Sequence, residues 1–182
     1  MALSLYNLSS IVIFALANND RGGSLPTDLF LTLPHLQWFQ IYGNQFSGSI
    51  PISLSNASEL KVFSAELNNF TGKVSVNFGG LQRFLKLNIY GNNLGSGDAD
   101  EMDFFQSLVN CSSFQYMGLT ENQLEGTLPK VSTQHKFFLF LKKKKKKKKK
   151  TLNFSQLAKI LFLEKFLQNL YSGQHDQLIY GW

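Results

Sequence analysis

The densest group of chemically active side chains in the sequence lies between Asp98 and Asp103, where four of six residues are acidic. Clustered carboxylates suit a hard cation such as Ca²⁺, which prefers oxygen ligands. An EF-hand loop in this register would need a glycine where Asp103 stands and a glutamate where Val109 stands. Because neither is present, we predict no metal site in this stretch.

The remaining candidates for catalysis or metal binding are isolated in the sequence. His35, His135 and His175 lie far apart and have no neighbouring ligand pattern. Cys111, the single cysteine, excludes an intrachain disulfide and occupies a position that leucine fills in other repeats, so we interpret it as a buried apolar residue. We therefore predict no catalytic residues, no cofactor and no metal.

A recurring asparagine defines the elements that must position any functional side chain. It appears at Asn19, Asn44, Asn68, Asn92 and Asn122, with spacings of 25, 24, 24 and 30 residues. A period in the twenties is typical of solenoid proteins, in which each repeat packs on its neighbours. The asparagine is expected at the turn after a strand, where its amide satisfies buried backbone groups of adjacent coils.

Apolar residues precede the asparagine by three, five, eight and eleven positions, as Ile41, Phe39, Leu36 and Leu33 do before Asn44. The alternation at the end of this pattern predicts a short strand, and successive strands form a parallel sheet. Each apolar residue is buried only when the next coil stacks over it. A glycine and an Ile-Pro step follow, and they predict a tight turn and then a second extended segment.

The fourth repeat is six residues longer than the two before it, and its extra sequence, Gly95 to Leu108, predicts a short helix. Ser96 or Asp98 is expected to cap the helix N-terminus, and Phe104 and Leu108 are expected to face the core. Three acidic residues would complement the helix dipole in the first turn: Asp100, Glu101 and Asp103.

The repeat pattern, LxxLxxLxLxxNxLxGxIP, resembles the plant-type leucine-rich repeat. The stretches LPHLQWFQIYGNQFSGSIP and NNLGSGDADEMDFFQSLVNCS are similar to ectodomains of plant leucine-rich-repeat receptor-like serine/threonine kinases, in the group that includes immune receptors for bacterial patterns. The resemblance covers residues 1–134. It implies an α/β solenoid, a leucine-rich-repeat horseshoe of about five uncapped repeats with a short parallel sheet on its concave side.

The same resemblance implies a function. Such ectodomains lie on the extracellular side of the plasma membrane and bind a peptide or protein ligand together with a co-receptor ectodomain. This chain has no G-x-G-x-x-G, H-R-D or D-F-G motif and no apolar run long enough to span a membrane, so we expect no kinase activity and a truncated fragment. A stand-alone secreted interaction protein, or a non-functional gene-fragment product, is the alternative.

Two further segments follow the repeats. Residues 135–150 form a low-complexity segment in which nine consecutive lysines, Lys142 to Lys150, produce the net charge of +6. Without these lysines the balance is −3, so the charge is no argument for a nucleic-acid partner. The block is either a polybasic membrane, nucleic-acid or nuclear-targeting signal, or translated non-coding sequence. Residues 151–182 fit either an amphipathic tail or a degenerate repeat.

Outward-facing strand positions are the predicted ligand-binding residues, since large amphipathic side chains anchor interfaces. The main candidates are Trp38, Gln40, Tyr42, Glu66, Lys86, Asn88, Tyr90 and Tyr116, and the other outward positions are Gln37, Lys61, Val62, Ser64, Gln115, Gly118 and Thr120. Five N-glycosylation sequons favour an extracellular setting: Asn7, Asn56, Asn69, Asn110 and Asn153.

Overall fold

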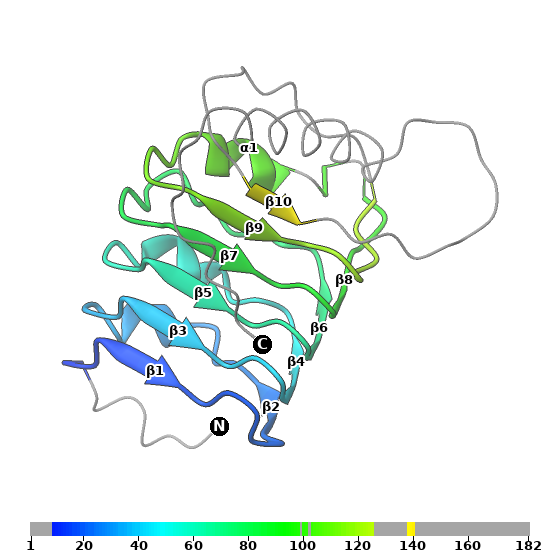
Figure 1. Ribbon diagram of the computed structural model, residues 1–182, viewed down its shortest axis with the longest axis horizontal. Helices are drawn as coiled ribbons and strands as arrows, with labels where there is room; N and C mark the ends of the chain where they lie inside the picture. The colour runs from blue at the N-terminus through cyan, green and yellow to red at the C-terminus, as the bar shows by residue number, and fades with distance from the viewer. Residues whose placement is uncertain (1–8, 99, 102, 126–137, 141–182) are drawn as a thin grey trace, which may run out of the picture.

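The computed structural model describes residues 9–98, 100–101, 103–125 and 138–140. The chain winds into a solenoid whose successive coils stack in one direction, so that strands from different repeats lie side by side (Figure 1). Two parallel sheets result, a large one and a smaller one. The predicted leucine-rich-repeat solenoid is confirmed.

The large sheet takes one strand from each of the five repeats and adds a sixth strand. Its order is β1 (Ile13–Ala15), β3 (Trp38–Gln40), β5 (Val62–Ser64), β7 (Lys86–Asn88), β9 (Tyr116–Gly118) and β10 (Phe138–Phe140). Every neighbouring pair is parallel, and the central residues of the repeat strands, such as Phe39 and Phe63, are partners in register. Strand β10 lies beyond the predicted repeats, so the sheet continues into residues 135–150, which we predicted to be a low-complexity segment.

The smaller sheet consists of β2 (Gly22–Ser24), β4 (Gln45–Gly48), β6 (Asn69–Gly72) and β8 (Asn93–Leu94). The expected second extended segment therefore lies before the Ile-Pro step, which corrects the prediction. The reason is that Pro51 has no N–H to donate to a ladder, and the chain turns at Gly48, whose φ is +78°. After Pro51 the chain forms the 3-10 helix η3 (Ile52–Asn56), as it forms η2 (Leu29–Leu31) one repeat earlier.

Stacked phenylalanines fill the core between the two sheets. The rings of Phe14 and Phe39 are 5.1 Å apart between centroids, and those of Phe39 and Phe63 are 5.5 Å apart, all nearly parallel. Phe84 continues the core in the fourth repeat and stacks on Phe114, at 5.7 Å, in the fifth. Each ring is buried only because the adjacent coil covers it, as the period predicts.

The recurring asparagine forms a hydrogen-bonded ladder along the coils. Asn68 shows the pattern: its Nδ2 donates to the carbonyls of Ile41 (2.9 Å) and Ala65 (3.2 Å), and its Oδ1 accepts from the Phe46 N–H (2.9 Å). The same bonds to two coils recur at Asn44, Asn92 and Asn122. The predicted structural role of this residue is confirmed.

The residue before each ladder asparagine adopts a left-handed conformation. The five positions are Asn18, Gly43, Leu67, Gly91 and Glu121, whose φ angles are 54°, 65°, 54°, 65° and 55°. Glycine adopts this conformation without strain, whereas a side chain disfavours it. Leu67 therefore holds a strained backbone on the surface of the solenoid.

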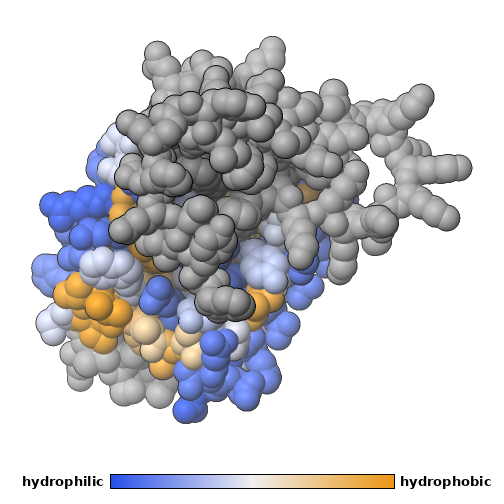
Figure 2. All heavy atoms as spheres, viewed as in Figure 1, coloured by the Kyte–Doolittle hydropathy of each residue, from blue (hydrophilic) through white to orange (hydrophobic). Residues whose placement is uncertain are grey.

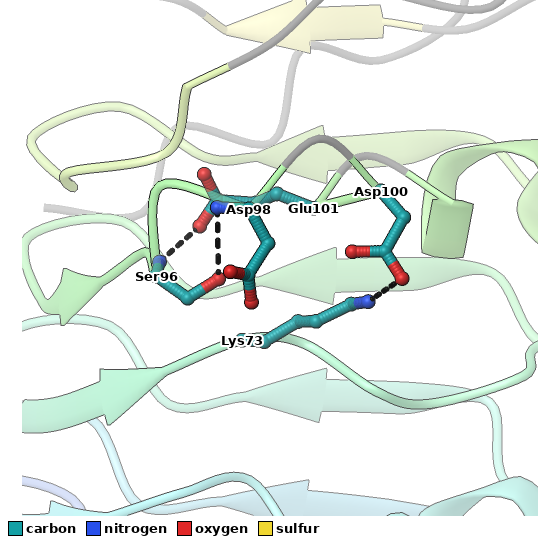
Figure 3. A network of polar contacts seen from close by, with 5 residues as sticks. All are labelled: Lys73, Ser96, Asp98, Asp100 and Glu101. Carbon is teal, nitrogen blue, oxygen red and sulfur yellow. Dashed lines mark hydrogen bonds and ion pairs between the residues drawn. The ribbon is translucent and has the colours of Figure 1, made fainter.

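The expected helix is present as α1 (Asp103–Val109), and it is shorter than predicted. Phe104 and Leu108 are buried, as expected. The predicted N-caps Ser96 and Asp98 and the predicted first-turn residue Glu101 all precede the helix, so these predictions are wrong. Glu101 is fully buried: its carboxylate accepts from the Ser96 N–H (Figure 3) and from the Glu125 N–H. Asp100 also precedes the helix and forms an ion pair with Lys73. These contacts hold the loop, so Asp103 is the acidic residue of the first turn.

Candidate recognition surface

The side of the large sheet that faces away from the core is the surface that the sequence predicts to be concave, and we call it the open face. Strand residues alternate between the core and this face. The strand register arranges the open face in rows that cross the strands. The first row is Ile13, Trp38, Val62, Lys86 and Tyr116; the middle row is Ala15, Gln40, Ser64, Asn88 and Gly118.

A last row follows directly after the strands and contains Tyr42, Glu66 and Tyr90. Backbone hydrogen bonds keep it aligned: the Gly43 N–H donates to the Glu66 carbonyl at 3.0 Å, and the Leu67 N–H donates to the Tyr90 carbonyl at 2.8 Å. All eight main candidates from the sequence therefore lie in the three rows. The structure brings them onto one surface although they are spread over four repeats.

Apolar side chains at the β1 end of the open face were absent from the candidates. Val12 and Ile13 are exposed, and Ile13 stands beside Trp38 in the first row. Figure 2 shows an apolar area in the part of the view where β1 and β3 lie. The repeat pattern could have identified Ile13, because it occupies the same position in the first repeat as the candidate Trp38 does in the second.

Asn88, in the middle row, is 7% exposed, and no hydrogen bond joins its side chain to another described residue. Its Oδ1 is buried and has no partner, and no other side-chain nitrogen or oxygen in the described ranges is in that state. The carboxamide lies over Gly118, where a Cβ would come within 2.1 Å of Oδ1. Gly118 therefore provides the space that Asn88 occupies.

Two lysines lie over aromatic rings of the first row. The Lys61 ammonium is 4.9 Å from the centroid of the Trp38 ring, and the Lys86 ammonium is 5.0 Å from that of Tyr116. A cation over an aromatic face is attracted by the ring quadrupole, so each lysine has a preferred position. Each ammonium keeps N–H donors directed away from its ring.

The acidic group of the open face is Glu66, whose Oε2 accepts from the Ser64 hydroxyl at 2.6 Å. Burial raises the pKa of Tyr116, and the nearby Glu66 carboxylate raises it further. The Tyr116 phenol therefore stays protonated well above neutral pH. Across the three rows and Lys61, two lysines face one glutamate, so this surface carries net positive charge.

The described sequon asparagines lie away from the open face. Asn56 ends η3, Asn69 begins β6 in the smaller sheet, and Asn110 follows α1; all three are exposed. Asn7 and Asn153 fall outside the described residues. Glycosylation at the three exposed sites remains a prediction, and it would leave the large sheet uncovered.

The described residues show neither a metal-binding cluster nor a catalytic arrangement. No three His, Cys, Asp or Glu side chains in these ranges come together as metal ligands. Within the same ranges, no helix has the length and apolarity needed to cross a bilayer.

Cys111 is buried, and its thiol donates a hydrogen bond to the Phe78 carbonyl at 2.8 Å. Burial raises the pKa of Cys111 to about 11, so the sulfur stays in the unreactive thiol form. His35 lies within the described residues and outside the open-face rows, whereas His135 and His175 fall outside the described residues.

Comparison with known proteins supports the assignment of the repeats as leucine-rich repeats. The Leucine Rich Repeat family model matches residues 35–57. A curated relative, the calmodulin-binding receptor kinase CaMRLK of Arabidopsis thaliana, is 36% identical over 92 residues. The aligned region covers 49% of this chain and 13% of the relative, so the chain spans a small part of that protein's length.

Two solved plant ectodomains share the fold. The ectodomain of the Arabidopsis thaliana receptor kinase GASSHO1/SCHENGEN3, solved with CASPARIAN STRIP INTEGRITY FACTOR 2, gives a TM-score of 0.63 at 27% identity over 75% of this chain and 16% of that one. The Arabidopsis receptor kinase HAESA, solved with the peptide hormone IDA and the co-receptor SERK1, gives 0.63 at 23% identity over 76% of this chain and 23% of that one. The chain is thus a leucine-rich-repeat solenoid of the kind found in plant receptor kinase ectodomains.

Proposed function

We propose that this chain is a protein- or peptide-recognition segment of a leucine-rich-repeat receptor kinase ectodomain, and that it binds its ligand on the open face. The observation that carries the proposal is the unpartnered, buried Oδ1 of Asn88 in the middle of that face. Buried polar groups in folded proteins are almost always hydrogen-bonded, and an exception points to a missing partner.

The composition of the open face supports a binding role. Trp38, Tyr42 and Tyr90 are partly buried, and such amphipathic rings supply contact area while their polar ends reach solvent. These side chains are not needed to close the core, which the inward phenylalanines fill. Selection for folding alone therefore does not account for three aromatic residues on this surface.

The relatives support the receptor setting of the proposal. GASSHO1/SCHENGEN3 and HAESA were each solved with a bound ligand, and HAESA also with a co-receptor. By analogy, we infer a peptide or protein ligand, a co-receptor ectodomain as a second partner, and a location on the extracellular side of the plasma membrane. The role is non-catalytic, since the proposed work of this segment is binding.

Selection from a random peptide display library against the full chain tests the proposal. Peptides enriched by the wild-type chain are expected to bind at least tenfold more weakly to a Trp38→Ala/Tyr90→Ala variant, which removes two open-face rings. Leu31→Ala/Ile52→Ala is the matched control, because both side chains are exposed apolar residues on the 3-10 helices. Loss of binding in the control with full binding in the open-face variant would overturn the proposal.

The extracellular setting has its own test. In a secretory host, the chain fused to a secretion signal is expected to carry glycans at Asn56, Asn69 and Asn110, since all three are exposed. Mass spectrometry before and after enzymatic deglycosylation measures the occupancy. Complete absence of glycans at these three sites would contradict the predicted glycosylation and remove its support for an extracellular setting.

A further inference from the structure

We propose that the ligand of the open face is an extended peptide that runs across the strands of the large sheet and carries two acidic side chains four residues apart. Each acidic side chain would pair with one of the lysines that lie over an aromatic ring, Lys61 or Lys86. The inference rests on the proposed function and adds the chemistry and spacing of the ligand.

The spacing follows from the positions of the two rings. Trp38 is on β3 and Tyr116 is on β9, and β5 and β7 lie between them. Neighbouring strands are about 4.8 Å apart, so the two cation–aromatic pairs are about 14 Å apart. An extended peptide advances about 3.4 Å per residue, which matches a separation of about four residues. Residues i and i+4 of such a peptide point to the same side, so both side chains can face the sheet.

The charge of the two pairs selects a carboxylate. Lys61 and Lys86 have no ion-pair partner among the described residues, whereas Lys73 pairs with Asp100 and Arg83 pairs with Glu59 elsewhere on the solenoid. An ammonium held over a ring keeps donors for a charge-assisted hydrogen bond to a carboxylate. Among the described residues, Asp98 and Asp100 lie close together in the loop that precedes α1 (Figure 3), and Asp103 begins the helix. An acidic peptide is therefore attracted to the open face and repelled from that loop.

Asn88 supplies an independent anchor between the two charged positions. It stands on β7 in the middle row, between the rings of β3 and β9 in strand order. Its Oδ1 has no donor, and the χ2 torsion of an asparagine is soft, so a small rotation of the carboxamide presents the oxygen to a ligand. A backbone N–H of the peptide, between its two acidic residues, is the donor that fits. Gly118 permits this arrangement because any side chain there would collide with the carboxamide.

Two synthetic peptide isomers test the spacing on the full chain. Acetylated and amidated GSESGSESG places its glutamates four residues apart, whereas GSESGESSG has the same composition and charge with a spacing of three, which puts them on opposite sides. Titration followed by fluorescence of the chain's tryptophans is expected to show at least fivefold tighter binding of the first isomer at low salt. The lysine block, Lys142 to Lys150, contributes equally to both isomers because it responds to charge alone. Equal affinities would overturn the inference.

Matched lysine variants locate the binding. Lys61→Met and Lys86→Met are each expected to remove the difference between the isomers, because each deletes one carboxylate partner. Lys73→Met makes the same chemical change at a lysine that pairs with Asp100, and it is expected to preserve the difference. Asn88→Ala is expected to weaken binding of the favoured isomer about threefold with its fold intact by circular dichroism. A Lys73→Met chain that loses the preference as fully as Lys86→Met would contradict the assignment.

Failure of this inference is distinguishable from failure of the proposed function. If the isomers bind equally while library-selected peptides still depend on Trp38 and Tyr90, the acidic spacing is wrong and recognition on the open face stands. If neither the isomers nor the selected peptides respond to open-face substitutions, both proposals fall.

Discussion

Asn88 and Asn92 lie four residues apart in the same coil, and both are buried, with 7% and 6% of their surface exposed. Asn92 bonds two coils: its Nδ2 donates to the carbonyls of Ala65 and Ile89, and its Oδ1 accepts from the Phe70 N–H. Asn88, on the open face, leaves its Oδ1 without a partner. The same residue type is therefore fully bonded at the turn of the solenoid and left unbonded on the sheet surface.

The difference shows that the asparagine at the turn is needed for folding, whereas the asparagine on the sheet surface is not. A ladder asparagine satisfies backbone groups that would otherwise be buried without partners, so folding requires it. No backbone group of the described residues depends on the side chain of Asn88. We infer that the ladder and the phenylalanine core provide stability, while the open face is free to vary for recognition.

The largest change in stability is expected from the inner side of the sheet. Phe63→Ala removes a fully buried ring that stacks on Phe39, and the cavity should lower the free energy of unfolding by about 4 kcal/mol. Urea denaturation followed by circular dichroism measures it. Phe63→Leu is the control and should lose about 1.5 kcal/mol, since it keeps most of the volume. Equal losses in the two variants would show that the site collapses around the cavity.

The ladder is expected to give the next largest effect. Asn92→Ala leaves the Phe70 N–H and the Ala65 carbonyl without their side-chain partner, and the unfolding free energy should fall by about 3 kcal/mol. Hydrogen exchange should show faster exchange at the Phe70 amide in this variant. A stability within about 0.5 kcal/mol of the wild type would mean that solvent replaces these bonds.

Relief of backbone strain should give a smaller effect of the opposite sign. Leu67 is 47% exposed with φ at +54°, so Leu67→Gly should raise the unfolding free energy by about 0.5 kcal/mol, after the flexibility of glycine in the unfolded chain is subtracted. Leu31 is similarly exposed and is not among the positive-φ residues of the described chain, so Leu31→Gly should destabilise. A thermal melt that places both glycine variants below the wild type would contradict the strain assigned to Leu67.

The parts of the fold that could be predicted from sequence are those that repeat. The period located the parallel strands, the asparagine ladder and the inward positions, because the same residue types recur at the same places in successive coils. The left-handed position before the ladder also left a signal, since Gly43 and Gly91 precede Asn44 and Asn92. The two glycines indicate a recurring left-handed backbone position that the apolar pattern alone did not suggest.

The remaining features depend on contacts between coils that no local pattern records. Glu101 was expected to complement the helix dipole, yet its carboxylate accepts a hydrogen bond from the N–H of Glu125 in the following repeat. Asn88 looks like an exposed strand residue, yet it is buried, and its Oδ1 occupies the space that a side chain at Gly118 on the next strand would need. Sequence therefore identified the rows of the open face, and the structure was needed to find its unpartnered oxygen.

The most direct test of the division between folding and recognition is the stability of Asn88→Ala, measured by urea denaturation beside Asn92→Ala. We expect Asn88→Ala to stay within about 0.5 kcal/mol of the wild type in unfolding free energy, because the substitution breaks no hydrogen bond. Destabilisation of Asn88→Ala by as much as Asn92→Ala would show that the open-face asparagine stabilises the fold, and it would contradict the proposed division between folding and recognition.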